Sequence, residues 1–164
     1  MNSVTQALYE AYVGEAKAVL RLGLFAQRAE KDGYPQIAKL FRAIEASERI
    51  HGERCLRILR EIKDTETNLS DAFEAETKIA GVAYDKMIQL AVEEGNSAAE
   101  KHFSQSRDVE AQHAKLYKEA MEHLMEEEET TYYICDVCGY VSDGVLPDEC
   151  PVCGVGKERF RSFE

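Results

Sequence analysis

The sequence predicts an all-α four-helix bundle followed by a small metal-binding β module with four cysteines. Apolar residues recur with a helical period through roughly the first 125 residues, where Gly and Pro are sparse. The composition then changes near residue 126, after which Gly, Pro, Cys and aromatic residues dominate. Two C-x-x-C pairs stand in this last segment. We therefore predict two domains, a helical bundle over residues 1–127 and a four-cysteine module over residues 128–164.

Composition and charge exclude several classes of protein. The 164 residues carry a formal net charge of -11, which disfavours nucleic acid and anionic membrane surfaces as partners. No apolar run approaches the roughly 20 residues that a membrane-spanning helix needs. The N-terminal segment MNSVTQALYEAYVGEAK is amphipathic and lacks the basic start and apolar block of a signal peptide. We expect a cytoplasmic protein.

The helical pattern divides into four elements. The first helix is predicted over about residues 3–30 and ends at KDGYP, where Gly and Pro favour a tight turn. The second is predicted over about 35–62 and ends at KDTETNLS, a run of capping and turn residues. The third is predicted over about 70–94, with Gly95 as its C-cap, and the fourth over about 97–126. Four helices of this length favour a bundle.

Each apolar stripe is interrupted by charged or metal-ligating side chains. A buried carboxylate without a counter-charge loses several kcal/mol of solvation, so these groups need a common partner. Four carboxylates and two imidazoles converging at one level would neutralise two metal ions, and an E-x-x-H pair shares one helix face. The six predicted ligands, in chain order, are Glu15, Glu48, His51, Glu76, Glu110 and His113.

The pattern also repeats in the two halves of the chain. A single Glu is followed 33 or 34 residues later by an E-x-x-H pair, once in each pair of helices. A lone E-x-x-H is commonly a surface pair, but two in matching register on inner stripes favour a metal site. Glu74 is an alternative to Glu76, although only Glu76 continues its stripe. We interpret His102 and His123 as surface residues.

The four C-terminal cysteines form two knuckles that suit a tetrahedral metal ion. Each C-x-x-C pair is followed by a glycine, which permits a tight backbone turn around sulfur. Clustered C-x-x-C pairs without an export signal favour metal binding over disulfides, and four thiolates suit iron or zinc. The predicted ligands are Cys135, Cys138, Cys150 and Cys153. The fifth cysteine, Cys55, is interpreted as a small buried side chain.

These motifs resemble the rubrerythrin family over essentially the whole chain. GEAKA and ASERIHGE match its first helical pair, FEAET and VEAQHAK the second, and ECPVCG its rubredoxin-like domain. The resemblance implies a ferritin-like di-iron bundle and one rubredoxin-like iron, for which zinc is the alternative. It further implies a peroxidase that reduces hydrogen peroxide in oxidative-stress defence, supplied with NAD(P)H electrons through a separate reductase or a rubredoxin. Tyr84 matches a position that hydrogen-bonds ligands in the family.

One position departs from the family pattern. Typical members of the family that this chain resembles carry a further Glu three residues after the third-helix ligand. This chain has Ile79 at that position. Isoleucine cannot ligate a metal, and the equivalent first-helix residue is Ala18. Oxygen reduction, or a ferroxidase or iron-handling role, is therefore the alternative to peroxide reduction.

The predicted connection between the second and third helices bears on assembly. In a ferritin-like bundle these helices run in the same direction, so their connection must return along the bundle. The eight residues of KDTETNLS reach only about 26–29 Å when fully extended, which barely covers that distance. We therefore expect a homodimer in which the first two helices of one chain pack with the last two of another.

Overall fold

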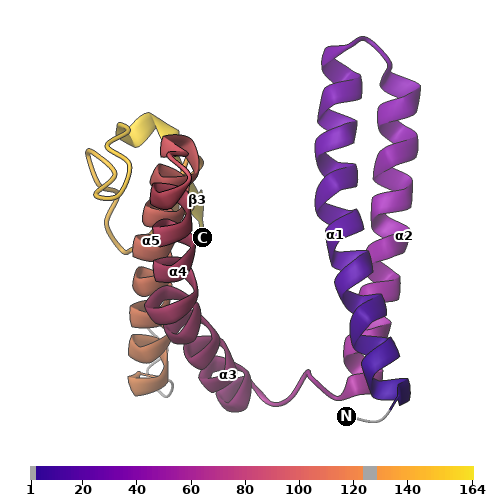
Figure 1. The fold of residues 1–164 in the computed structure, drawn as a ribbon, viewed down its shortest axis with the longest axis horizontal. Coiled ribbons are helices and arrows are strands. Elements are labelled where there is room, and N and C mark those ends of the chain that lie inside the picture. Colours follow the sequence, from indigo (N-terminus) through magenta and orange to yellow (C-terminus); the bar gives the residue numbers. More distant parts are fainter. Residues whose placement is uncertain (1–2, 124–128) are drawn as a thin grey trace. The chain divides into compact units, whose positions relative to one another are not determined.

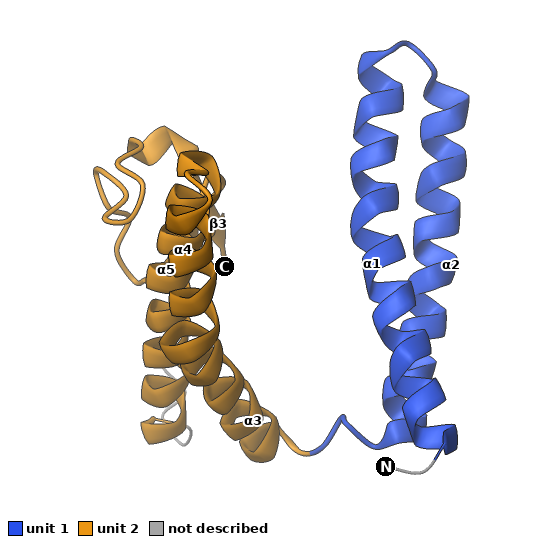
Figure 2. Ribbon diagram, in the orientation of Figure 1, with its two compact units in different colours: residues 1–63 blue, residues 64–164 orange. Residues whose placement is uncertain are grey.

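The computed structural model describes residues 3–123 and 129–164. Contacts divide the chain into two compact units, residues 1–63 and residues 64–164 (Figures 1 and 2). The first is a helical hairpin, and the second holds the remaining helices together with the C-terminal module. Each unit is described by itself.

The first unit consists of α1 (Ser3–Lys31) and α2 (Pro35–Leu59). Gly33 adopts the left-handed conformation (φ 81°) that the turn requires, and Pro35 begins α2 at a position where its missing N–H costs nothing. Near this turn the helices pack through fully or nearly buried alanines, which allow close approach. Phe25 and Phe41 meet beside them with ring centroids 5.7 Å apart. The predicted first helix and turn therefore agree with the structure.

The connection between the units differs from the prediction. Helix α2 ends at Leu59 rather than near residue 62, because Arg60 adopts the left-handed conformation and its N–H bonds back to the helix. Helix α3 (Thr65–Lys78) begins five residues before the predicted start, because the Asp64 carboxylate accepts a 2.8 Å hydrogen bond from the Thr67 N–H. Most of KDTETNLS is therefore helix, and the non-helical stretch is residues 60–64.

The second unit contains two long helical segments. Helix α3 continues through a π-helical turn, η1 (Ile79–Ala83), into α4 (Tyr84–Glu93), so the predicted third helix is interrupted rather than regular. Helix α5 (Ser97–Glu122) starts where the Asn96 side chain accepts from the Ala99 N–H. The predicted end of this helix, near residue 126, lies outside the described residues.

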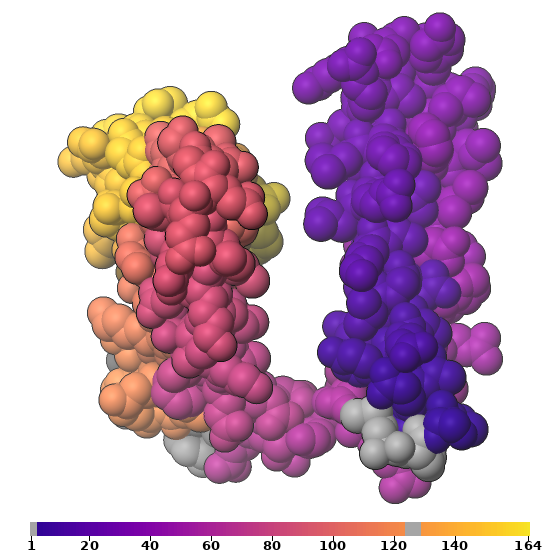
Figure 3. Space-filling model, viewed as in Figure 1, coloured from indigo at the N-terminus to yellow at the C-terminus, as the bar shows by residue number. Residues whose placement is uncertain are grey.

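The C-terminal module is a three-stranded antiparallel sheet in the order β2-β1-β3. It consists of β1 (Tyr132–Cys135), β2 (Val141–Asp143) and β3 (Phe160–Phe163), with a short 3-10 turn, η2 (Lys157–Arg159), before β3. Cys135 lies at the end of β1, opposite Phe160. Figure 3 shows this module, in yellow, in direct contact with the helices of its own unit.

The predicted fold class is confirmed, a ferritin-like set of four helical rods followed by a small strand module that bears the four cysteines. No helix within the described residues is long and apolar enough to cross a membrane. The proposed boundary between residues 127 and 128 stays a prediction, because it lies within residues 124–128, which the structure does not describe.

Candidate metal centres

The first unit brings three predicted ligands together. Glu15 lies on α1, and Glu48 and His51 lie one turn apart on α2. Nδ1 of His51 is 2.9 Å from Glu48 Oε2 and 3.8 Å from Glu15 Oε1. Gly52 lies against Glu15 where the helices meet, and a Cβ on it would stand 3.5 Å from the Glu15 Cβ, an ordinary contact distance. The three donor atoms lie within 4.8 Å of one another, close enough for one metal ion.

The second unit repeats this arrangement almost atom for atom. Glu76 lies on α3, and Glu110 and His113 lie one turn apart on α5. Nδ1 of His113 is 3.0 Å from Glu110 Oε2 and 4.0 Å from Glu76 Oε1. All three side chains are partly buried, and their donor atoms again lie within 4.8 Å of one another. The duplication predicted from the sequence is therefore present in the geometry.

Close approach of the carboxylates raises the pKa of one glutamate in each group. Burial raises the pKa of Glu76 to about 7, helped by its hydrogen bond to Glu110 and by the negative charge there. The pKa of Glu15 is also raised, chiefly through its hydrogen bond to Glu48. A bound cation would offset the negative charge that these carboxylates place on one another. Both groups therefore have the charge and donor chemistry that fit a divalent or trivalent iron.

The two histidines present the same nitrogen to the carboxylates. In each group it is Nδ1, which leaves Nε2 directed elsewhere. For His113, Nε2 lies 3.4 Å from the main-chain carbonyl oxygen of Gly139 in the C-terminal module. A tautomer with the proton on Nε2 donates toward that carbonyl and leaves the Nδ1 lone pair free for a metal. The module thus touches the imidazole that belongs to the second carboxylate group.

The four cysteine sulfurs have the spacing of a tetrahedral metal site. Cys135 Sγ is 3.7 Å from Cys153 Sγ, and Cys138 Sγ is 3.6 Å from Cys150 Sγ. Four sulfurs about 2.3 Å from a central ion would stand about 3.8 Å apart, so the cage matches a metal–thiolate bond length. All four thiols are free, as expected for ligands rather than disulfides.

Matched hydrogen bonds build the two knuckles around these sulfurs. The N–H of Gly139 donates to the Cys135 carbonyl at 2.9 Å, and the N–H of Gly154 donates to the Cys150 carbonyl at 2.9 Å. Burial raises the pKa of the Cys135 thiol, but main-chain N–H groups of Cys138 and Val137 outweigh it, and its pKa lies below the ordinary value. These donors stabilise the Cys135 thiolate, the form that binds metal, whereas burial raises the pKa of Cys138 and of Cys153.

The π-helical turn sets the direction of Tyr84. Regular α-helix would place a residue eight positions after Glu76 about 80° away around the helix axis. A π turn accommodates one additional residue, so Tyr84 stands about 20° from Glu76, on the same face. The Tyr84 ring packs 6.3 Å from Phe103 of α5. Ile79, the first residue of the π turn, is 39% exposed and offers no ligand atom.

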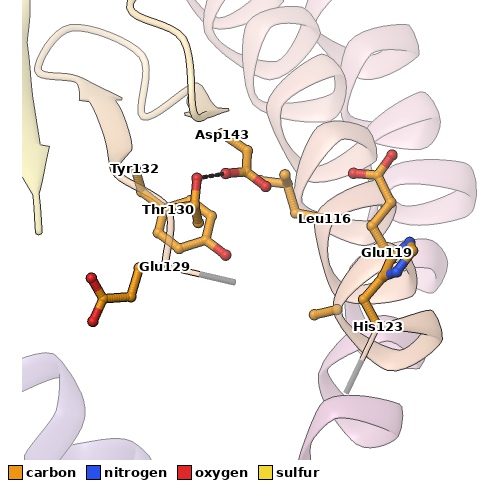
Figure 4. A pocket seen from close by; sticks show the side chains of 8 residues that line it. Leu116, Glu119, His123, Glu129, Thr130, Tyr132 and Asp143 are labelled. Atoms are coloured by element: carbon orange, nitrogen blue, oxygen red, sulfur yellow. Dashed lines mark hydrogen bonds between the residues drawn. The ribbon is translucent and has the colours of Figure 1, made fainter. Parts of the chain in front are cut away.

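A polar cavity of about 430 Å³ lies between the end of α5 and the strands β1 and β2 (Figure 4). Asp143 accepts a short hydrogen bond from the Thr130 hydroxyl, whereas Glu119 and His123 project from the helix. Glu129 points away from the other carboxylates in this view. None of these residues belongs to the three groups of ligand atoms found among the described residues.

Comparison with known proteins identifies the family. The family model described as Rubrerythrin matches residues 6–121, and the model for the rubrerythrin rubredoxin-like domain matches residues 133–161. The chain belongs to the rubrerythrin family. It is 31% identical to Rubrerythrin-2 of Clostridium acetobutylicum, over 95% of this chain and 94% of that protein. It is 28% identical to nigerythrin of Nitratidesulfovibrio vulgaris, over 99% of this chain and 88% of the relative.

Solved structures agree with this assignment. The partially reduced and the fully reduced, all-ferrous states of nigerythrin both match with a TM-score of 0.61 and 28% identity, covering 99% of this chain and 88% of theirs. As a member of this family, the chain is an oxidoreductase with a di-iron site and a rubredoxin-like iron site. The predicted family, fold class and cofactors are therefore confirmed.

The sequence predicted all three clusters of ligand residues, but it did not predict the contact between the four-cysteine module and the second carboxylate–histidine group. Gly139 was interpreted only as a knuckle glycine, yet its carbonyl faces His113. Val109, one turn before His113 on α5, is 4% exposed and packs against Gly139, with its Cγ1 3.9 Å from the position a Cβ would take. Cys55 is half-buried and lies outside the three groups of ligand atoms.

Proposed function

We propose that the protein reduces hydrogen peroxide to water with electrons passed from the rubredoxin-like iron to the di-iron site. The observation that carries this proposal is the contact between the four-cysteine module and His113. In this assignment the thiolates hold the single iron, and the two carboxylate–histidine groups hold the di-iron site. The di-iron ligands are Glu15, Glu48, His51, Glu76, Glu110 and His113, and the single-iron ligands are Cys135, Cys138, Cys150 and Cys153.

The path between the two centres is short in covalent terms. From Cys138 it runs through one peptide to the Gly139 carbonyl and then across the 3.4 Å contact to Nε2 of His113. Gly139 and His113 are both partly buried, and the buried Val109 packs against Gly139. This arrangement supports electron transfer within one chain, from the module to the helix on which it rests.

The chemistry needs two electrons and two protons for each peroxide, giving two molecules of water. A di-iron carboxylate site supplies both electrons at one place, and the four-thiolate iron replaces them one at a time. The Tyr84 hydroxyl, on the same helix face as Glu76, is assigned to position the oxidant by hydrogen bonding. The electrons come from NAD(P)H through a separate reductase or a rubredoxin, and a cytoplasmic location remains our expectation.

Ile79 favours a second candidate function. It follows Glu76 by one helical turn and brings an alkyl side chain where the family pattern has a further carboxylate. Without that carboxylate the site has six protein ligands, and an apolar wall suits dioxygen better than the polar peroxide. Oxygen reduction, or ferrous-ion oxidation in an iron-handling role, is therefore the alternative.

Stopped-flow oxidation separates the two functions. The fully reduced protein is mixed with peroxide or with oxygen, and the absorbance of both iron centres is followed. The proposal predicts that peroxide oxidises the protein at least about tenfold faster than oxygen at equal concentration. Ile79→Glu provides the matched variant and is expected to raise the ratio further. If oxygen reacts as fast as peroxide, the peroxidase assignment is wrong and the alternative stands.

The helix limits support a di-iron site shared between two chains. His51 lies about 12 Å before the end of α2, and Glu76 lies about 16 Å after the start of α3. To bring both to one level with α2 and α3 parallel, the connection must cover about 30 Å, including a lateral step of about 10 Å. Residues 60–64 reach only about 20 Å when fully extended. A homodimer that exchanges helix pairs removes this conflict.

Mixing two inactive variants tests the shared site. Glu48→Ala disables the first helix pair and Glu110→Ala disables the second. In an exchanged heterodimer of these variants one site receives both damaged pairs and the other receives two intact pairs. Refolding the variants together is therefore expected to restore about a quarter of the wild-type di-iron sites, from random pairing. If each chain builds its own site, the mixture restores none.

A further inference from the structure

The two knuckles of the four-cysteine module stand in different environments. The first, from Cys135 to Gly139, meets α5 through the contacts of Gly139 with His113 and Val109. The second, from Cys150 to Gly154, makes its described hydrogen bonds within the module, to Val155 and across its own turn. Because C-x-x-C pairs approach a tetrahedral ion from two sides, the second knuckle offers a route to the metal that does not pass through α5.

The surface of the second knuckle is small and apolar, and an acidic side chain lies at its border. Pro151 and Gly154 are exposed, and Val152 and Cys153 are half-buried, so that sulfur lies close to solvent. The Glu149 carboxylate lies over the turn, with Oε1 3.3 Å from the position a Gly154 Cβ would occupy. No cation pairs with Glu149 among the residues that the structure describes. A negative charge therefore stands uncompensated beside the outer sulfur.

The acidic residue within the first knuckle, Asp136, is neutralised. Asp136 forms a 3.1 Å ion pair with Arg161 of β3. On the second knuckle, Asp148 has its own pair with Lys157 at 3.0 Å, which leaves Glu149 as the unbalanced charge. Within the described part of the chain, the second knuckle therefore carries an unpaired negative charge, whereas the charge on the first knuckle is paired. An unpaired charge steers an oppositely charged partner during diffusional encounter.

We propose that the external electron donor docks on the second knuckle, over Pro151, Val152 and Gly154, with Glu149 opposite a basic group of the donor. The partner is an electron-transfer protein with an apolar contact surface bordered by Lys or Arg. Electrons would then enter through Cys153 and leave through Gly139 on the opposite side of the same ion. This inference rests on the proposed function in that it takes the four-cysteine iron as the place where electrons are received.

The test measures reduction of the four-cysteine iron without any oxidant. Anaerobic oxidised protein is mixed with NADPH and a ferredoxin–NADP+ reductase, the probe donor, and loss of the ferric thiolate absorbance is followed. Glu149→Lys is expected to lower the second-order rate constant about tenfold at low ionic strength, with the difference shrinking at high salt. Reduction by dithionite, which needs no docking surface, is expected to change less than about twofold.

Asp136→Lys is the matched control, because it makes the same charge change on the other knuckle of the same module. It is expected to leave reduction by the reductase within about twofold of the wild type. A second readout uses zinc-substituted protein, in which calorimetry measures binding of the reductase without electron transfer, and Glu149→Lys should weaken it about as much as it slows reduction.

Two outcomes would overturn the proposal. One is an unchanged rate and affinity for Glu149→Lys, and the other is a larger effect of Asp136→Lys, which would put the docking surface on the first knuckle. Since no peroxide or oxygen is present, a failure of the peroxidase assignment leaves this test intact. Conversely, a protein that reacts with peroxide but ignores both charge changes retains its proposed function and loses only the docking surface.

Discussion

Replacing Glu76 by Gln should stabilise the metal-free protein at alkaline pH. The pKa of this carboxyl is raised from 4.5 to about 7 in the folded state, first by burial and then by Glu110. A raised folded pKa means that the stabilising, protonated form is fully present below pH 4.5 and is lost as the pH rises through 7. At 1.36 kcal/mol per pKa unit the ceiling is about 3 kcal/mol, and the 22% exposure of the side chain reduces the expected cost to about 2 kcal/mol.

Urea unfolding of chelator-treated protein at equal protein concentration measures this effect. At pH 8 the free energy of unfolding of Glu76→Gln should exceed that of the wild type by about 2 kcal/mol, and at pH 4.5 the two should coincide. Glu74→Gln, an exposed neighbour on the same helix, is the control and should change stability by less than about 0.5 kcal/mol. With iron bound, Glu76→Gln should instead lose metal. A Gln variant no more stable than the wild type at pH 8 would refute the account of carboxylate repulsion.

Three further predictions follow from the other features of the second unit. Gly139→Ala forces a Cβ into a left-handed turn (φ 85°) and moves the carbonyl away from His113, so electron transfer between the iron centres should slow in rapid-mixing experiments. Gly154→Ala introduces the same strain (φ 75°) on the outer knuckle and should leave that rate unchanged. Deleting Val82 should convert the π turn to regular helix and preserve cooperative urea unfolding, whereas deleting Gln89 from α4 rotates every later residue by about 100° and should abolish it. Cys153→Ser should lower the iron content from about three to about two ions per chain and remove the ferric thiolate absorbance. A wild-type protein that contains one zinc per chain would contradict the iron assignment.

The helices and ligand groups were predictable because each depends on residue type and spacing. A carboxylate or imidazole on an apolar stripe is unusual enough to indicate a site, and the duplicated pattern predicts which glutamates belong to it. The start of α3 was harder to predict from the sequence. Thr65 and its neighbours resemble a linker because they are polar. In the structure they form the solvated first turn of a helix, in which the Thr67 N–H donates a hydrogen bond to the Asp64 carboxylate.

The spacing of residues around the π turn is irregular in the sequence, but this irregularity alone does not predict a π turn. Glu76, Ala80 and Tyr84 are separated by two steps of four, a drift of about 80° that a regular helix would express as a change of face. The π turn that begins at Ile79 contains one additional residue, and this compensates for the change in angular position around the helix axis. The residue that stands where the family pattern has a further Glu is therefore also the first residue of the irregular turn.

The contact between Gly139 and His113 could not have been predicted, and the reason is physical. A side-chain ligand must be one of a few residue types, but a main-chain carbonyl is supplied by any residue and carries no mark in the sequence. What selects a glycine at position 139 is the left-handed turn that ends the first knuckle, and Val109 of α5 lies beside this turn. Gly154 satisfies the first requirement equally and faces Glu149 instead of a helix. Two knuckles with matched sequence thus have different surroundings, because the first packs against α5 and the second lies beside the Glu149 carboxylate.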